Sequence, residues 1–151
     1  MVTQGDRPGT KMVSDLNLHR RAFWAFFAER LPELNAKTER GNESSRWLAV
    51  GPTPLIAVHY ISTQSVGIFV RGARGTRVGH IRERLFPHRE FLATALDRQH
   101  LRLGENFLLG DRLKGAMLDD AKWPHAIDWF AERSPVYERA LKALQRRRIE
   151  M

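Results

Sequence analysis

Apolar side chains in the first part of the chain recur with the period of a helix. From Ser14 to Leu34 they fall on one broad face when each residue turns by about 100°. Ser14 suits the N-cap of this helix, and Asp15 follows in the first turn, where a carboxylate is favourable. We expect the apolar stripe to face the core rather than a cofactor. It consists of Leu16, Phe23, Phe26, Phe27, Leu31 and Leu34, with Trp24 at its edge.

The middle of the chain changes to the period of a strand. The polar segment 35–45 is expected to be a loop, and Arg46–Val50 is predicted to be a short strand that ends before a Gly- and Pro-rich break. Leu55–Ser62 is apolar on both faces, which predicts a central strand, and Ser65–Arg71 is predicted to form a hairpin with it. One side of the first hairpin strand carries Ile56, Val58 and Tyr60, and the inward side of the second carries Val66, Ile68 and Val70.

The second half of the chain alternates between helix and strand patterns. A helix is expected from about Arg77 to Asp97, kinked or divided at Pro87. Leu101–Leu109 and Arg112–Leu118 are predicted to form a second hairpin around the turn at Gly110-Asp111.

The last part of the chain carries an amphipathic seam in which apolar residues alternate by four and three. It runs from Trp123 to Leu144, and Pro124 suits the first position of the helix that this seam predicts. Ser134-Pro135 lies in the middle of the seam, so we expect the helix to kink or restart there.

Together these elements predict one α+β domain with the order α-β-β-β-α-β-β-α. The sheet is expected to have about five strands, antiparallel or mixed, with the helices mainly on one face. A chain of 151 residues has the usual length of one domain. We assign residues 13–145 to this domain, residues 1–12 to a flexible N-terminal tail and residues 146–151 to a basic C-terminal tail.

The charge of the chain narrows the classes of partner. Its net charge of +8 attracts polyanions such as nucleic acid, although simple solubility is the plainer explanation. The sequence contains no Cys, which excludes disulfides and thiolate metal sites and fits a reducing compartment. No apolar run approaches the roughly 18–20 residues of a membrane span, and the N-terminus lacks the apolar core of a secretory signal. We therefore expect a cytoplasmic protein that does not contact membranes.

One block of the chain, Ser44–Arg82, contains arginines but no acidic residue. Within it, Gly72 and Gly75 would let a ligand approach the backbone of the loop before the second helix, and the first turn of that helix offers N–H groups to an anion. Arginines around this loop suit phosphate oxygens, whereas a solvated loop without a ligand is the alternative interpretation. The candidate nucleic-acid-binding residues are Arg71, Arg74, Arg77, Arg82 and Arg89.

Two aromatic motifs indicate a relationship to a known family. Residues 21–27 (RAFWAFF) resemble an early R-x-FW-x-x-F helix, and residues 123–130 (WPHAIDWF) resemble a late W-P-x-x-x-x-W helix start. In this order and spacing the motifs resemble the bacterial domain of unknown function numbered 4268, over about Asp15 to Leu144. The resemblance implies no defined activity. Members of that family also occur joined to nuclease-like or restriction-associated regions, which points to work on DNA.

Catalytic chemistry finds little support in the sequence. The predicted order of elements also resembles the core of the PD-(D/E)XK nucleases, whose second and third core strands carry the carboxylates that hold Mg²⁺. Leu55–Ser62 and Ser65–Arg71 carry none, so such a domain would be degenerate and without its metal site. His59 is interpreted as a structural histidine in an apolar strand. We expect no catalytic residue, no metal and no cofactor.

Three functional hypotheses follow from these observations. The first is a non-catalytic accessory domain that binds DNA or RNA through backbone phosphates, with little sequence preference. The second is a protein–protein interaction module that binds another protein or a second copy of itself, through an exposed apolar patch that includes Trp24 and Trp129. The third is a degenerate nuclease-like domain or a small enzyme whose site is assembled from distant residues.

Overall fold

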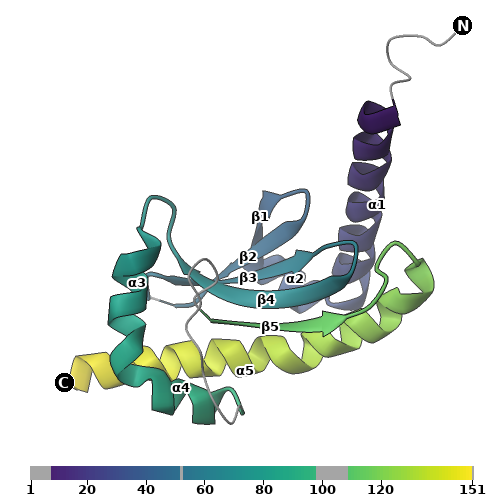
Figure 1. The fold of residues 1–151 in the computed structure, drawn as a ribbon. Coiled ribbons are helices and arrows are strands. Elements are labelled where there is room, and N and C mark those ends of the chain that lie inside the picture. Colours follow the sequence, from purple (N-terminus) through teal and green to yellow (C-terminus); the bar gives the residue numbers. More distant parts are fainter. Residues whose placement is uncertain (1–7, 52, 98–108, 151) are drawn as a thin grey trace, which may run out of the picture.

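Five strands, consecutive in the chain, form one antiparallel sheet in the order β1-β2-β3-β4-β5 (Figure 1). The computed structural model describes residues 8–51, 53–97 and 109–150. This architecture confirms the predicted α+β class and the five-stranded sheet, and it selects the antiparallel alternative. The strands are β1 (Thr38–Asn42), β2 (Ser45–Ala49), β3 (Leu55–Ile61), β4 (Ser65–Gly72) and β5 (Leu109–Lys114).

Helices cover one face of this sheet. The long helix α5 runs along that face with α4 beside it, α3 passes the end of the sheet, and α1 stands at the opposite end (Figure 1). The helices are α1 (Pro8–Arg30), α2 (Pro32–Lys37), α3 (Val78–Leu85), α4 (Arg89–Ala95) and α5 (Trp123–Glu150), with 3-10 turns at Phe86–His88 and Asp120–Lys122. The expected placement of the helices mainly on one face is therefore confirmed.

The core lies between the sheet and helices α1 and α5. Phe23 and Phe27 of α1 are fully buried against Phe130 of α5, and the rings of Phe27 and Phe130 meet edge to face at 5.7 Å. Burying an aromatic side chain of this size contributes roughly 1.5–3 kcal/mol. The sheet contributes alternate residues to the same core, among them Ala57, Ile61, Val66, Ile68 and Val70.

The prediction of a loop over residues 35–45 is wrong. Residues 38–42 form β1, which pairs with β2 from Thr38 opposite Leu48 to Asn42 opposite Ser45. The side chain of Asn42 closes the turn, because its Oδ1 accepts a hydrogen bond from the Ser44 N–H at 2.7 Å. β1 is an edge strand with one neighbour, so its polar sequence, TERGN, does not need the apolar alternation of an inner strand.

The predicted hairpin turn at Gly110-Asp111 is also wrong. β5 runs straight through these residues and pairs with β4 from Leu109 opposite Val70 to Lys114 opposite Ser65. Gly110 allows close pairing, because a Cβ at this position would lie 3.2 Å from the Cβ of Phe69. The described residues therefore place four strands before α3 and one after it; the other predicted strand, 101–109, lies mostly outside the described residues.

Prolines mark some helix boundaries but not all of them. α1 begins at Pro8, so the N-cap predicted at Ser14 is wrong. Pro87 divides the predicted helix 77–97 into α3 and α4, as expected. By contrast, α5 continues as one helix through Pro135, so the restart that we considered there does not occur.

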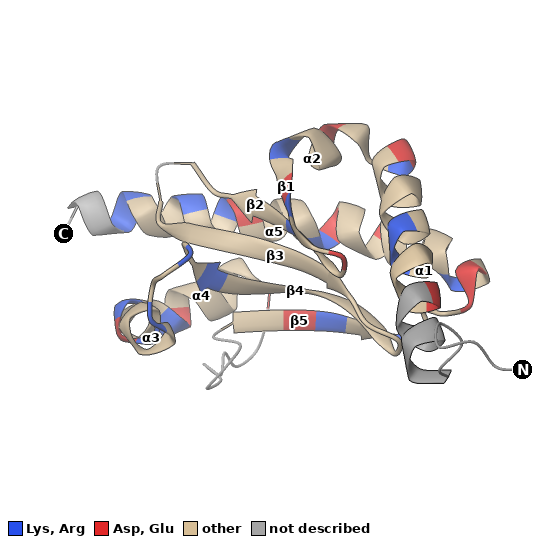
Figure 2. Cartoon of the chain, turned by 90° about the horizontal axis from the view of Figure 1, so that it is seen from above, with Lys and Arg blue, Asp and Glu red and all other residues tan. Residues whose placement is uncertain are grey.

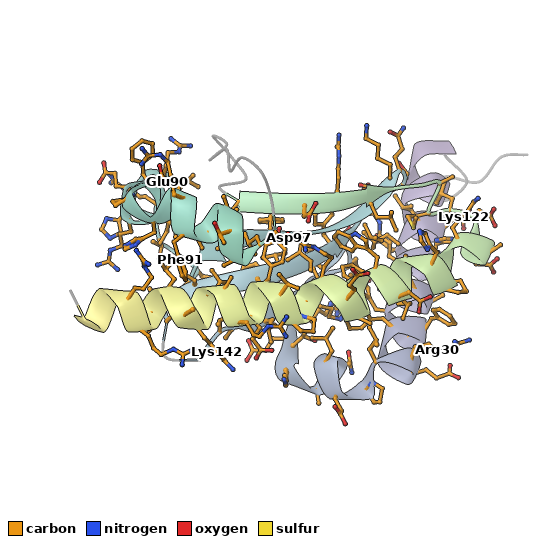
Figure 3. All side chains as sticks on the ribbon, turned by 90° about the horizontal axis from the view of Figure 1, so that it is seen from below. Arg30, Glu90, Phe91, Asp97, Lys122 and Lys142 are labelled. Carbon is orange, nitrogen blue, oxygen red and sulfur yellow. The ribbon has the colours of Figure 1, made fainter. Side chains whose placement is uncertain are left out.

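The basic end of the chain belongs to α5, which extends to Glu150. Here the guanidinium of Arg147 lies 4.4 Å from the centroid of the Phe91 ring, and Figure 3 shows Phe91 on α4, next to this part of α5. Residues 146–150 are thus helical, and Arg147 packs on the domain.

Candidate nucleic-acid interface

The face of the sheet opposite α5 is the candidate interface, and we call it the open face. Alternation along β3 defines it: His59 points to α5, where its Nε2 lies 2.9 Å from the Oγ of Ser134, so Val58 and Tyr60 point the other way. Figure 2 looks down on this face and shows β3, β4 and β5 with α5 behind them.

Strand register determines which residues share the open face. Trp47 of β2, Val58 of β3 and Phe69 of β4 lie side by side in one row that continues to Gly110 of β5. The next row runs from Ser45 through Tyr60 and Gly67 to Arg112, and a third contains Ala49, Ile56 and Arg71. Three aromatic side chains, those of Trp47, Tyr60 and Phe69, are therefore partly exposed on one surface.

Two of these rings lie across glycines of the neighbouring strands. A Cβ at Gly67 would come within 2.5 Å of Cε1 and Cζ of Tyr60, and a Cβ at Gly41 would come within 2.5 Å of Cδ1 of Trp47. Only glycine lets the rings lie this close to the backbone. The Tyr60 and Phe69 rings are also neighbours, with centroids 5.8 Å apart.

Cations flank the aromatic residues at both ends. The guanidinium groups of Arg71 and Arg74 lie 4.4 Å and 4.2 Å from the Trp47 ring centroid, within the range of cation–π attraction. Arg71 is further fixed by a 3.0 Å hydrogen bond from its Nε to the carbonyl oxygen of Gly72. At the far edge, Arg112 and Lys114 of β5 are exposed.

Acidic residues are scarce on this surface. Glu39, paired with Trp47, is the acidic residue that strand register places on the open face within the described part of the chain. Asp111 in β5 points to the other side of the sheet, where its carboxylate meets Arg133 of α5 at 2.8 Å. The open face, like the block Ser44–Arg82 in the sequence, is therefore nearly free of acidic side chains.

The structure separates the five arginines named from the sequence. Arg71 and Arg74 meet at Trp47, and Arg77 follows, exposed, directly before α3. Arg82 lies partly buried within α3, which runs past the end of the sheet toward α4 (Figure 1). Arg89 begins α4, on the helical side, where its guanidinium lies 4.1 Å from the Phe86 ring centroid. The first three belong to the open face and its adjoining loop, and Arg89 does not.

Sequence reasoning missed the aromatic part of the site and the cations of β5. The sequence pattern places Tyr60 on the same side of its strand as Ile56 and Val58. It does not indicate which side of the strand lies opposite the helices. Trp47 and Phe69 join Tyr60 only through strand pairing, which single-strand patterns do not reveal. The sequence pattern predicts a separate hairpin for Arg112 and Lys114, whereas the structure pairs them with β4.

His59 of β3 and Ser134 of α5 form a buried polar pair. His59 is 0% exposed and Ser134 is 2% exposed, and the ring of Phe130 lies 5.5 Å from that of His59. Burial lowers the pKa of His59 to about 4, so the imidazole is neutral at pH 7. Backbone groups of Ala57 and Arg46 act in the opposite direction on the pKa of His59, but burial is the larger effect.

A cavity of about 390 Å³ lies between the junction of α1 with α2 and the middle of α5. Its charged walls are balanced, because two cations, Arg30 and Lys37, line it together with two carboxylates, Glu33 and Glu138. This cavity lies on the helical side, away from the open face.

Metal and membrane sites are not found in the described part of the chain. The described residues hold no group of three or more His, Asp or Glu side chains that could bind a metal ion. β3 and β4 carry no carboxylate, so the nuclease-type metal site is missing from these strands. Within the same residues, no helix combines the length and apolar character that crossing a membrane requires.

Comparison of the chain with protein-family models, with curated proteins and with solved structures finds no match. The resemblance to the domain of unknown function numbered 4268 therefore stays a prediction.

Proposed function

We propose that this chain is a non-catalytic nucleic-acid-binding module that contacts backbone phosphates with the cations of the open face and its adjoining loop. The observation that carries the proposal is the meeting of Arg71 and Arg74 at Trp47. Arg77 follows in the adjoining loop, exposed, directly before α3, and Arg112 adds positive charge across the sheet. DNA and RNA share the phosphate chemistry that these groups recognise.

Stacked arginines are suited to this role for a physical reason. A guanidinium that packs on an indole keeps its N–H donors in the plane of the group, where phosphate oxygens can accept two of them. Stacking also restricts the side chain before binding, so less conformational entropy is lost when phosphate arrives.

The first test uses fluorescence anisotropy with labelled single-stranded and double-stranded 20-mers across a salt series. Changing Arg74, Arg77 and Arg112 together to Glu removes three exposed cations from the interface. Each phosphate contact contributes about 0.9 to the slope of log affinity against log salt for duplex, and about 0.7 for single strands. The variant should therefore lose roughly 2–3 units of duplex slope and at least tenfold in affinity at 150 mM salt.

A matched control separates a local interface from net charge. Lys122, Arg139 and Arg146 are exposed on the helical side, and Figure 3, a view from below, shows Lys122 near the start of α5. Changing these three to Glu lowers the net charge from +8 to +2, as the interface variant does. The control should bind within about threefold of the native protein at 150 mM salt. Equal losses in the two variants would refute the proposed location.

A second candidate function is a protein–protein contact, with another protein or a second copy. Trp24 cannot contribute the exposed patch expected of it, because it is 2% exposed. Leu18 and Leu118 are instead 57% and 55% exposed, and their segments meet where His19 Nε2 donates to the Leu118 carbonyl oxygen at 2.8 Å. Sedimentation velocity over a concentration series tests this candidate; a dimer that Leu18→Gln disperses would support it.

A further inference from the structure

The open face has a second property besides its charge, namely two neighbouring aromatic rings, one of which lies over the backbone of the next strand. We infer that the nucleic acid bound there is single-stranded and that its bases stack on Tyr60 and Phe69. This inference rests on the proposed function. It specifies that the bound nucleic acid is single-stranded and names the residues that contact its bases.

The position of Tyr60 is the first observation. Its hydroxyl and two of its ring carbons lie over the Cα of Gly67, so one side of the ring is packed against the backbone of β4. Tyr60 lies on the face opposite His59 and α5, and the residue is partly exposed. A ring held in this way offers a flat apolar surface to a base.

Phe69 adds a second ring beside Tyr60, with the two ring planes inclined by 54°. Its ring centroid lies 5.8 Å from that of Tyr60, and its neighbour across the strand pair is Gly110, which has no side chain. Glycines therefore follow both aromatic residues in the direction of β5, at Gly67 and at Gly110. Gly67 is covered by the Tyr60 ring, whereas Gly110 is exposed and leaves room beside Phe69 for an unstacked base.

Positive charge lies within reach of this surface. Arg112 shares a register row with Tyr60 and is separated from it by β4, which corresponds to about 10 Å at the usual strand spacing of 4.7–4.9 Å. On the other side of Phe69, the Trp47 ring holds Arg71 and Arg74. Because its ring already contacts two guanidinium groups, we assign Trp47 to positioning the arginines and leave base stacking to Tyr60 and Phe69.

Duplex does not fit this arrangement as well as a single strand does. The bases of a duplex stack on one another, so their faces are hidden from a flat protein surface, and only phosphates remain available. A single strand can place its bases on aromatic side chains, each of which contributes about tenfold to affinity as measured by truncation. The open face therefore favours single strands over duplex.

The experiment compares Tyr60→Leu, Phe69→Leu and Tyr60→Phe by anisotropy at 150 mM salt, on single-stranded DNA, single-stranded RNA and duplex DNA 20-mers. Each Leu variant should lose about tenfold in affinity for single strands and less than twofold for duplex, with an unchanged salt slope, because stacking releases no counterions. Tyr60→Phe keeps the ring and should bind like the native protein. Phe86→Leu removes a 53% exposed aromatic ring away from the open face and serves as the control.

A second measurement uses the native protein, so its result does not depend on whether a variant folds. Ultraviolet crosslinking of the native protein to a single strand that carries halogenated pyrimidines should produce adducts at Tyr60 or Phe69. Adducts confined to α1 or α5 would overturn the inference.

Failure of the inference is distinguishable from failure of the proposed function. If the Arg74/Arg77/Arg112 variant loses affinity for both nucleic acid forms while the Leu variants lose none, the inference is wrong and the phosphate-binding function stands. If the native protein binds neither single strands nor duplex at low salt, both are wrong. A preference for single-stranded RNA over single-stranded DNA that is lost in the Leu variants would support the inference. It would also show that the preferred ligand is RNA.

Discussion

At the scale of single residues, His59 links stability to pH. Burial lowers its pKa from 6.5 to about 4 in the folded state, so between these values the unfolded chain binds more protons than the folded one. Its contribution to stability is therefore complete above about pH 6.5 and is lost as the pH falls toward 4. We expect the free energy of unfolding, measured with urea, to fall by about 2 kcal/mol from pH 7 to pH 5 because of this residue.

The variant His59→Gln isolates this contribution. It should be less stable than the native protein at pH 7, because the packing beside Phe130 and the hydrogen bond to Ser134 are altered. Its stability should nevertheless change about 2 kcal/mol less between pH 7 and pH 5. Parallel pH profiles of the two proteins would show that the imidazole is not the group responsible.

Residue identity alone predicted part of the candidate site. The arginines of the loop, Arg71, Arg74 and Arg77, were found because they stand in an acid-free, glycine-containing segment. Their partner Trp47 was not found, because it reaches Arg71 only across β3, through two successive strand pairings. Long-range register of this kind has no local signal in the sequence.

At the scale of elements, the ion pair between Arg133 and Asp111 joins α5 to the edge strand β5. The two groups are 2.8 Å apart and mostly buried, and Arg133 also donates to the Leu96 carbonyl oxygen at 3.0 Å. Arg133→Met should lower the free energy of unfolding by about 2 kcal/mol, because a partly buried carboxylate and a carbonyl each lose this donor. Urea denaturation measures the change.

An exposed ion pair on the same helix provides the comparison. Lys142 meets Glu138 at 3.2 Å but is half exposed, so Lys142→Met should cost less than about 0.5 kcal/mol. The double variant Arg133→Met, Asp111→Asn should be more stable than the sum of the single losses predicts, because it removes both charges. Simple additivity would mean that the two side chains act independently.

The elements that the sequence predicted correctly are the ones with clear apolar patterns. β3 and β4 lie inside the sheet, and Pro87 divides α3 from α4. The two strands that the sequence predicts wrongly, β1 and β5, are the edges of the sheet. An edge strand has one neighbour and tolerates charged residues such as Glu39, Arg40, Arg112 and Lys114, which also discourage pairing with other sheets. The charged residues that protect these edges from pairing also interrupt the apolar alternation by which a strand is predicted from sequence.

At the scale of the whole molecule, the net charge of +8 and the interface should affect different steps of binding. Long-range attraction acts on encounter, whereas direct contacts determine how long the complex lasts. The control variant with Glu at Lys122, Arg139 and Arg146 keeps the open face intact. In stopped-flow measurements at about 20 mM salt it should associate several times more slowly than the native protein, with an unchanged dissociation rate.

Salt and the interface variant complete this comparison. At 150 mM salt the Debye length falls to about 8 Å, so charges on the helical side are screened from a strand bound to the open face. The control variant should then associate at the native rate. The Arg74/Arg77/Arg112 variant should instead dissociate faster at both salt concentrations, because it has lost contacts as well as charge. Faster dissociation of the control variant would mean that nucleic acid also touches the helical side, and the binding surface would have to be extended around the molecule.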